Sequence, residues 1–109
     1  MNKVEKIAKL NDLSRKDMGI RCKLVLTEGI QRLSYEDQLD IMEEVELYND
    51  FTPDNDPYGE RDFGNFEHNG KKIYWKIDYY APDMMYGSAD PSSPHMTRRV
   101  LTIMLASEY

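Results

Sequence analysis

The sequence contains a single cysteine, Cys22, among 109 residues. One thiol excludes an internal disulfide, and it also excludes a zinc site built from several cysteines. No apolar run approaches the roughly 20 residues that a membrane-spanning helix needs, and the first residues lack the apolar stretch of a signal peptide. By elimination, we expect a cytoplasmic protein that does not associate with membranes.

Glycine is also scarce, with six residues in the chain. They do not form the glycine-rich loop that cradles phosphate groups, so we expect neither a nucleotide site nor a cofactor. Aromatic residues, by contrast, are plentiful: eight Tyr, three Phe and one Trp. This aromatic content predicts a packed core, and the length is that of a single domain, residues 1–109.

Positive charge is missing from the middle of the chain. Residues 26–68 contain thirteen acidic residues and two basic ones, whereas residues 1–25 contain seven basic and three acidic residues. No Lys or Arg occurs between Leu33 and Glu60. The net charge of −6 argues against direct binding of nucleic acid by the whole domain. The uneven distribution bears on the kind of partner that the protein binds.

Two helices are predicted in the first half of the chain. One covers residues 3–18 and ends at Gly19, and a strand over residues 20–27 follows it. The other covers residues 35–48 and begins after Ser34, which is a good N-cap residue. Its apolar residues recur at three- and four-residue spacing and form a single stripe of Tyr35, Leu39, Ile41, Met42, Val45 and Tyr48. We expect this helix to pack on the core.

A β-hairpin is predicted over residues 61–80. Asn69-Gly70 is the strongest signal for a two-residue turn between strands, and folding about it determines the register. The register sets Phe66 opposite Ile73, Gly64 opposite Trp75, Glu67 opposite Lys72 and Arg61 opposite Asp78. Gly64 then leaves room for the indole ring, and two cross-strand pairs join opposite charges.

The end of the chain combines features of a helix with features of a strand. Its content of Leu, Met and Ala favours a helix over residues 97–108, although Val100, Thr102 and Ile103 also suit a buried strand. We predict an α+β fold: an antiparallel sheet around the 61–80 hairpin, with two or three helices packed on it. The 35–48 helix should cover Trp75 and Phe66.

Four segments carry a resemblance to a known family. They are DNDPYGERDFG at 54–64, WKIDYY at 75–80, YGSADPSSP at 86–94 and TRRVLTIMLASEY at 97–109. Together they resemble DUF3768, a family of small bacterial proteins of unknown function that occur on plasmids and prophages. The resemblance implies no activity and no catalytic residues. Many relatives have His at the position of Arg61 and Asp at that of Ser93, which argues against a base or metal ligand at either.

The acidic middle of the chain supplies the leading functional hypothesis. Carboxylates along the 35–48 helix and the loop after it predict a negative band that docks on a basic surface of another protein. The candidate partner-binding residues are Glu36, Asp37, Asp40, Glu43, Glu44, Glu46, Asp50, Asp54 and Asp56. The competing interpretation is a solvated face that only keeps the domain soluble.

The partner in this hypothesis is a nucleic-acid-binding complex, and the protein is a non-enzymatic module. A negative band can occupy a groove that normally receives nucleic acid. The resemblance to proteins of mobile elements extends the hypothesis to an anti-CRISPR or anti-restriction inhibitor that acts as a nucleic-acid mimic.

Two alternatives remain open. The first is a small metal-assisted hydrolase that uses the acidic loop residues Asp54, Asp56, Glu60 and Asp62. The spacing begins like a calcium loop but lacks the required glutamate at its twelfth position, and turn chemistry is the more common explanation of such residues. The second is a regulator that forms a homodimer through the apolar segment Met84-Met85-Tyr86.

Overall fold

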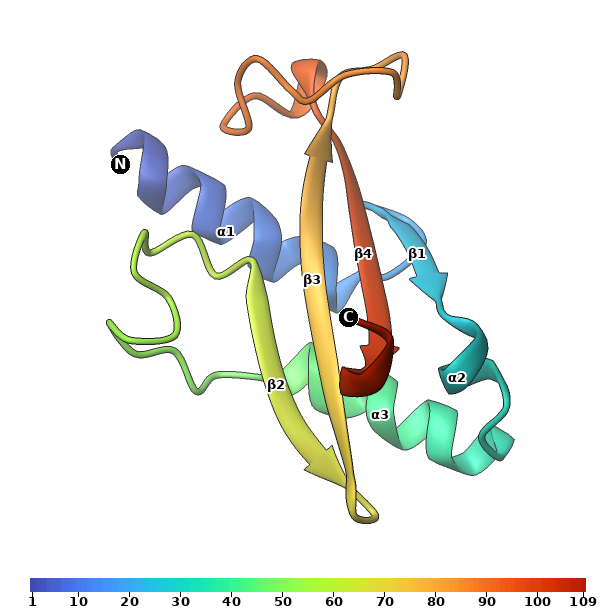
Figure 1. Ribbon diagram of the computed structural model, residues 1–109. Helices are drawn as coiled ribbons and strands as arrows, with labels where there is room; N and C mark the ends of the chain where they lie inside the picture. Colours follow the sequence, from blue (N-terminus) through green and yellow to red (C-terminus); the bar gives the residue numbers. More distant parts are fainter.

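The computed structural model describes all residues from Met1 to Tyr109 and contains three α-helices, four β-strands and two short 3-10 helices (Figure 1). The helices are α1 (Lys3–Lys16), α2 (Glu28–Gln31) and α3 (Tyr35–Leu47), and the strands are β1 (Lys23–Leu26), β2 (Phe63–His68), β3 (Lys71–Tyr80) and β4 (Arg98–Leu105). The 3-10 helices cover Pro94–Met96 and Ala106–Glu108. The protein has the predicted α+β fold.

The four strands form one sheet in the order β1–β4–β3–β2 (Figure 1). The pairs β2–β3 and β3–β4 are antiparallel, as predicted for a sheet around the hairpin, but β1 pairs with β4 in parallel. The sheet is therefore mixed. The first strand is also shorter than the predicted range 20–27, because Ile20 lies in a turn and is 85% exposed.

The hairpin has the predicted register. Phe66 pairs with Ile73, Gly64 with Trp75 and Glu67 with Lys72. The fully buried indole of Trp75 lies so close to Gly64 that a Cβ atom there would be 2.5 Å from the indole nitrogen. This contact explains why glycine occupies the position.

One predicted pair of the hairpin is wrong. Arg61 does not lie opposite Asp78, because β2 begins two residues later and Arg61 has a left-handed backbone conformation, with φ of 55°. Its guanidinium instead pairs with Asp12 of α1 at 2.8 Å, and Asp78 pairs with Lys76 on its own strand. Arg61 therefore contacts helix α1 and does not take part in pairing between β2 and β3.

The prediction of a helix over residues 97–108 is also wrong, since most of this segment is β4. This strand lies in the interior of the sheet, between β1 and β3, and Leu101 and Ile103 on its inner face are fully buried. Backbone pairing on both edges outweighs the weak helix preference of Leu and Met. Only Ala106–Glu108 forms a helical turn.

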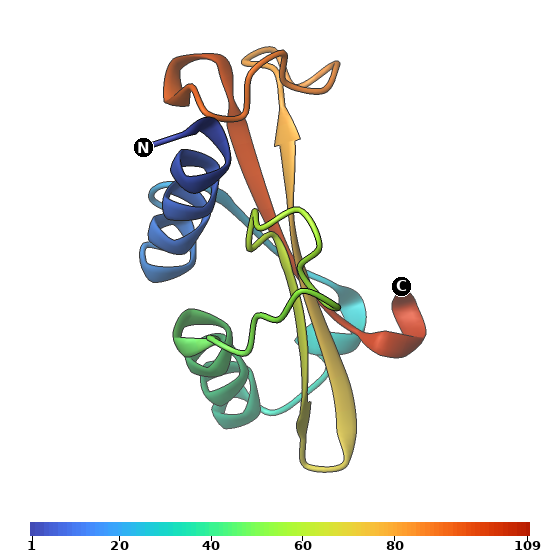
Figure 2. The ribbon, with the colours of Figure 1, turned by 90° about the vertical axis from the view of Figure 1, so that its left-hand side faces the viewer.

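Helices α1 and α3 cover the same face of the sheet (Figure 2). Ile41 and Val45 of α3 are fully buried and pack in one core cluster with Trp75, Ile73 and Leu101. Phe66 packs against this cluster at partial burial, which confirms the predicted position of α3 over Trp75 and Phe66. None of the helices has both the length and the apolar character needed to cross a membrane.

Helix α1 is attached to the sheet by a buried asparagine. Asn11 has no exposed surface, and its side-chain nitrogen donates hydrogen bonds to the Glu60 carbonyl at 2.9 Å and the Tyr79 hydroxyl at 2.8 Å. Its side-chain oxygen accepts a hydrogen bond from Arg99 Nε at 2.7 Å. Burial of an amide costs little when its groups are paired in this way.

A buried arginine joins α1 to α3. Arg15 is 4% exposed and donates hydrogen bonds to the carbonyls of Val45 and Tyr48, at 2.8 and 2.9 Å, where α3 ends. It also pairs with Asp12 at 2.8 Å, and its guanidinium lies over the ring of Trp75, 4.9 Å from the centroid. Arg15 of α1 thus interacts with the backbone carbonyls at the end of α3 rather than with the acidic side chains of α3.

Candidate functional site

Helix α3 presents a strongly acidic face to solvent. Ser34 begins the helix by accepting a hydrogen bond from the Asp37 backbone amide at 3.1 Å. Because Ile41 and Val45 turn toward the sheet, the opposite side of the helix is exposed. The exposed acidic residues of this helix are Glu36, Asp40, Glu43, Glu44 and Glu46, with Asp37 half-buried.

The acidic residues of α3 lack basic partners. The structure contains six ion pairs, and the only one that involves α3 joins Asp37 to His68. In the loop after the helix, Asp50 and Asp54 are exposed and unpaired, and Asp56 accepts a hydrogen bond from the Arg61 backbone amide at 3.1 Å. The nine predicted residues are here called the acidic surface, and none of their carboxylates forms an ion pair with a Lys or Arg.

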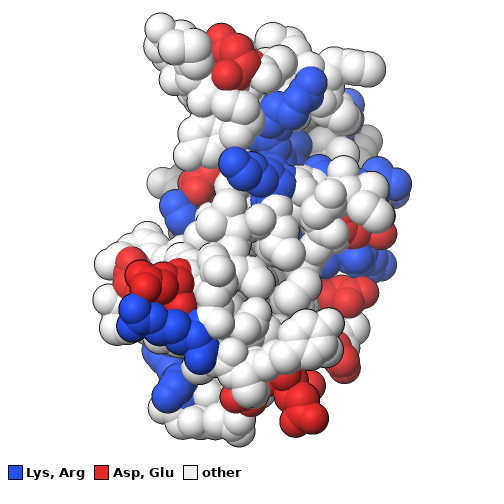
Figure 3. All heavy atoms as spheres, turned by 90° about the vertical axis from the view of Figure 1, so that its right-hand side faces the viewer, with Lys and Arg blue, Asp and Glu red and all other residues white.

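Helix α3 itself contains no Lys or Arg. Figure 3 views the protein from the β1 side: acidic side chains gather at the lower right, where α3 lies, and basic ones lie higher, around β1 and the beginning of β4, and also at the lower left. Lys23 and Arg98 are both exposed and make no ion pair. Lys16 at the end of α1 lines the same groove as Glu43 and Glu46 but forms no ion pair with either, so the field of the acidic surface is only partly offset.

Apolar side chains are exposed among the carboxylates. Tyr35 is 74% exposed, Leu39 46% and Leu47 68%. Tyr35 and Leu39 belong to the stripe that we expected on the core side, but neither packs against the core cluster. Leu39 lines a shallow groove between α3 and the end of α1 that Met18, Met42 and Glu43 also line. An apolar strip within a charged rim is the usual composition of a protein interface.

The acidic loop does not assemble a metal site. No three of its candidate ligands Asp54, Asp56, Glu60 and Asp62 bring their carboxylate oxygens within 4.8 Å of one another. Glu60 accepts a hydrogen bond from the Tyr79 hydroxyl at 2.8 Å. Burial, with the charges of Glu60 and Asp56 as lesser causes, raises the pKa of Asp62. Glu60 and Asp62, the loop residues whose carboxylates are partly buried, therefore contribute to the packing of the fold.

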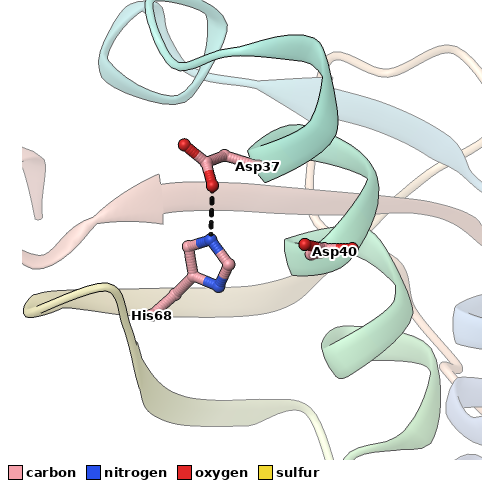
Figure 4. Close-up of side chains that lie close together, drawn as sticks. All are labelled: Asp37, Asp40 and His68. Carbon is pink, nitrogen blue, oxygen red and sulfur yellow. Dashed lines mark hydrogen bonds and ion pairs between the residues drawn. The ribbon is translucent and has the colours of Figure 1, made fainter.

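A different group of potential ligands is present at the start of the acidic surface. Asp37, Asp40 and His68 hold donor atoms within 4.8 Å of one another (Figure 4). His68 Nε2 lies 2.9 Å from Asp37 Oδ1, and the His68 side chain is only 13% exposed although it lies beside the hairpin turn. The hydrogen bond from His68, with a second from Ser34, lowers the pKa of Asp37.

Sequence comparison matches residues 26–108 to the family model described as a protein of unknown function, DUF3768. The chain belongs to the DUF3768 family. No curated protein and no solved structure matches it. The family match confirms the resemblance seen in the four sequence segments, and the family description assigns no activity to its members.

The part that matches DUF3768 begins at the last residue of β1. It contains α3, the hairpin and β4, and therefore both the acidic surface and the Asp37–Asp40–His68 group. Helix α1, with Asn11 and Arg15, precedes it.

Two other candidates are located by the structure. Met84, Met85 and Tyr86, the predicted dimer segment, are all exposed in the loop after β3, and their role in dimer formation stays a prediction. Cys22 is buried, with its sulfur 3.5 Å from the Ser14 carbonyl, and burial raises the pKa of its thiol. A raised pKa disfavours the reactive thiolate, so Cys22 is a core residue.

Proposed function

We propose that this DUF3768 protein is a non-enzymatic binding module whose acidic surface docks on a basic surface of another protein. The observation that carries the proposal is that no carboxylate of α3 pairs with a Lys or Arg although the chain has 14 of these residues. Like charges one helical turn apart cost roughly 0.2–0.5 kcal/mol per pair. A basic partner would relieve this repulsion.

The partner best suited to this surface is one that normally binds nucleic acid. From Glu36 to Glu46 the helix rises about 15 Å, a length over which one DNA strand carries about four phosphates. Helix α3 places six carboxylates along this length. Its charge per unit length is therefore comparable with that of a nucleic-acid strand, which is the basis for mimicry.

The exposed apolar residues favour a protein partner over a purely solubilising role. A solubilising face needs charge alone, whereas Tyr35, Leu39 and Leu47 expose apolar area within the same surface. Burial of such residues at an interface supplies binding energy, and the carboxylates around them supply orientation and a fast association rate.

The same reasoning supports a more specific proposal. A protein that covers the nucleic-acid groove of a CRISPR or restriction enzyme inhibits it by competition. The likeness to proteins of plasmids and prophages makes such a cytoplasmic defence system the target that we propose.

The test is a competition experiment on the partner recovered by affinity capture from the source cells. We expect the recovered protein to be basic, to release this protein when double-stranded DNA is added, and to bind less tightly as salt is raised. Reversal of charge in Glu43→Lys/Glu44→Lys should abolish binding, and the isosteric Glu43→Gln/Glu44→Gln should weaken it.

The matched control is Glu67→Lys, because Glu67 is exposed, forms no ion pair with Lys72 opposite it, and lies on β2 outside the acidic surface. This variant should bind normally. Circular dichroism establishes that each variant is folded. Binding that survives reversal at Glu43 and Glu44, or a partner that DNA does not displace, refutes the proposal.

A further inference from the structure

Potential metal ligands from two separate elements converge at one end of the acidic surface. Asp37 and Asp40 are three residues apart on α3, so their side chains project from the same face of the helix. His68 is the last residue of β2 and lies directly before the hairpin turn. Figure 4 shows the imidazole of His68 pointing at Asp37, with Asp40 one turn further along the helix.

The separation between the ligand atoms of His68 and Asp37 is close to that of two ligands on one metal ion. His68 Nε2 and Asp37 Oδ1 are 2.9 Å apart. The side-chain amide of Asn69 lies 3.0 Å from this oxygen and 3.3 Å from this nitrogen. Two ligand atoms bound at about 2.0–2.1 Å in tetrahedral or octahedral geometry lie roughly 3.0–3.4 Å from each other. A half-turn of the Asn69 amide would present its oxygen to the same point.

We propose that Asp37, Asp40 and His68 bind a divalent transition-metal ion, with Zn²⁺ as the ion that fits the donors best. One imidazole nitrogen and two carboxylate oxygens form a donor set that zinc accepts, whereas calcium and magnesium prefer oxygen alone. The order of affinities also favours zinc over manganese and iron for such a set. Water or Asn69 would complete the coordination.

The surroundings favour a cation. No Lys or Arg forms an ion pair with any of the three ligands, and Glu36 and Glu44 on the same helix are exposed and unpaired. The Asp40 carboxylate also accepts no hydrogen bond within the protein. It is therefore an acidic side chain beside the His68–Asp37 pair with no evident role in the fold.

Metal binding would have a structural consequence. It would replace the single hydrogen bond between His68 and Asp37 by bonds that join the hairpin turn to the first turn of α3. It would also reduce the negative charge at this end of the acidic surface. Asp37 and Asp40 also belong to the acidic surface, but Glu43 and Glu44, whose substitution tests partner binding, are not among the ligands. Failure of one proposal can therefore be distinguished from failure of the other.

Isothermal titration of the intact protein with Zn²⁺ in a non-chelating buffer at neutral pH tests the proposal. We expect saturable binding of one ion per chain, together with a shift of the His68 imidazole signals in NMR spectra. Asp40→Asn should weaken binding at least about tenfold, and its fold should be intact because this side chain makes no contact that the fold uses. His68→Gln should abolish binding.

Matched controls exist for both ligand types. His95→Ala removes the other histidine, which is exposed in the 3-10 helix before β4, and Asp50→Asn removes an exposed carboxylate elsewhere in the acidic surface. Both variants should bind Zn²⁺ as the parent protein does. Absence of saturable binding up to about 1 mM Zn²⁺ overturns the proposal. So does unchanged binding in Asp40→Asn, and so does loss of binding in His95→Ala. If His68→Gln does not fold, Asp40→Asn alone decides.

Discussion

At the residue scale, Gly64 shows how closely the interior of the hairpin is packed. Any side chain there would meet three indole atoms of Trp75 at 2.5–2.8 Å, and the indole cannot retreat because it is fully buried. Two more aromatic rings pack edge-on against it, Tyr48 with its centroid 5.4 Å away and Phe51 with its centroid 6.2 Å away. The indole of Trp75 can therefore occupy this position only because residue 64 has no Cβ atom.

Gly64→Ala should lower the free energy of unfolding by about 1–3 kcal/mol, because an added methyl group overpacks a core that has no room to adjust. Urea denaturation followed by the fluorescence of Trp75 measures the change. Gly87→Ala is the control: its Cβ would lie 3.8 Å from the nearest atom, and its stability should change by less than about 0.5 kcal/mol. Equal stability of the two variants would contradict the packing argument.

The phenol of Tyr79 predicts a loss of stability in alkali. Its pKa is raised well above the ordinary value, chiefly by burial and also by its hydrogen bond to Glu60. Above about pH 10 the unfolded chain loses this proton while the folded chain keeps it. The free energy of unfolding should therefore fall by about 1 kcal/mol between about pH 10 and 11.

Denaturation curves across this pH range provide the measurement. Tyr79→Phe should be less stable at neutral pH, because Asn11 and Glu60 lose a partner, but its stability should fall less steeply with pH. The control Tyr58→Phe replaces a tyrosine that is 79% exposed and should keep the parent slope. The idea fails if Tyr79→Phe and the parent protein show the same pH dependence.

At the element scale, Arg15 is the main polar link between α1 and α3. We expect Arg15→Met to lower the free energy of unfolding by about 3 kcal/mol, because the carbonyls of Val45 and Tyr48 and the carboxylate of Asp12 lose a buried cation. Chemical denaturation measures the loss, and Lys16→Met, at the exposed neighbouring position, should have little effect. A loss below about 1 kcal/mol would show that apolar packing alone holds the two helices together.

Elements that depend on nearby residues were predicted well, and those that depend on distant ones were not. The hairpin register follows from Asn69-Gly70, so its pairs could be read from about twenty residues of sequence. The strand β4 pairs with β1, which lies near the other end of the chain, and no pattern within residues 97–108 indicates which strand they pair with. The predicted pairing of Arg61 was wrong for the same reason, since Asp12, the residue with which Arg61 forms its ion pair, lies on α1.

The candidate site shows the same difference between features that depend on nearby residues and features that depend on distant ones. The acidic surface was predictable because its residues adjoin in sequence and lack basic neighbours on their own helix. The approach of His68 to Asp37 was not, since it requires the hairpin to fold back over the start of α3. The exposure of Tyr35 and Leu39 also escaped prediction, because periodicity gives the direction of a stripe but not the extent of the sheet beneath it.

At the scale of the whole molecule, the unneutralised charge of α3 predicts that salt stabilises the protein. Raising NaCl from about 0.05 to 0.5 M screens repulsion between the carboxylates, and we expect the melting temperature to rise by about 2–5 °C. Calorimetry measures this shift. Glu43→Gln/Glu44→Gln should start from a higher melting temperature and respond less to salt. A melting temperature that falls with salt in both proteins would mean that the acidic surface is compensated.

The position of β4 determines when the protein can fold during its synthesis. This strand lies between β1 and β3 but follows both in the chain. A nascent chain on the ribosome therefore carries β1 and the finished hairpin as two pieces with unpaired edges, which are open to association with other chains. Only when translation has passed residue 105 and that stretch has left the exit tunnel can one strand join them, so the domain acquires its sheet late and in a single step.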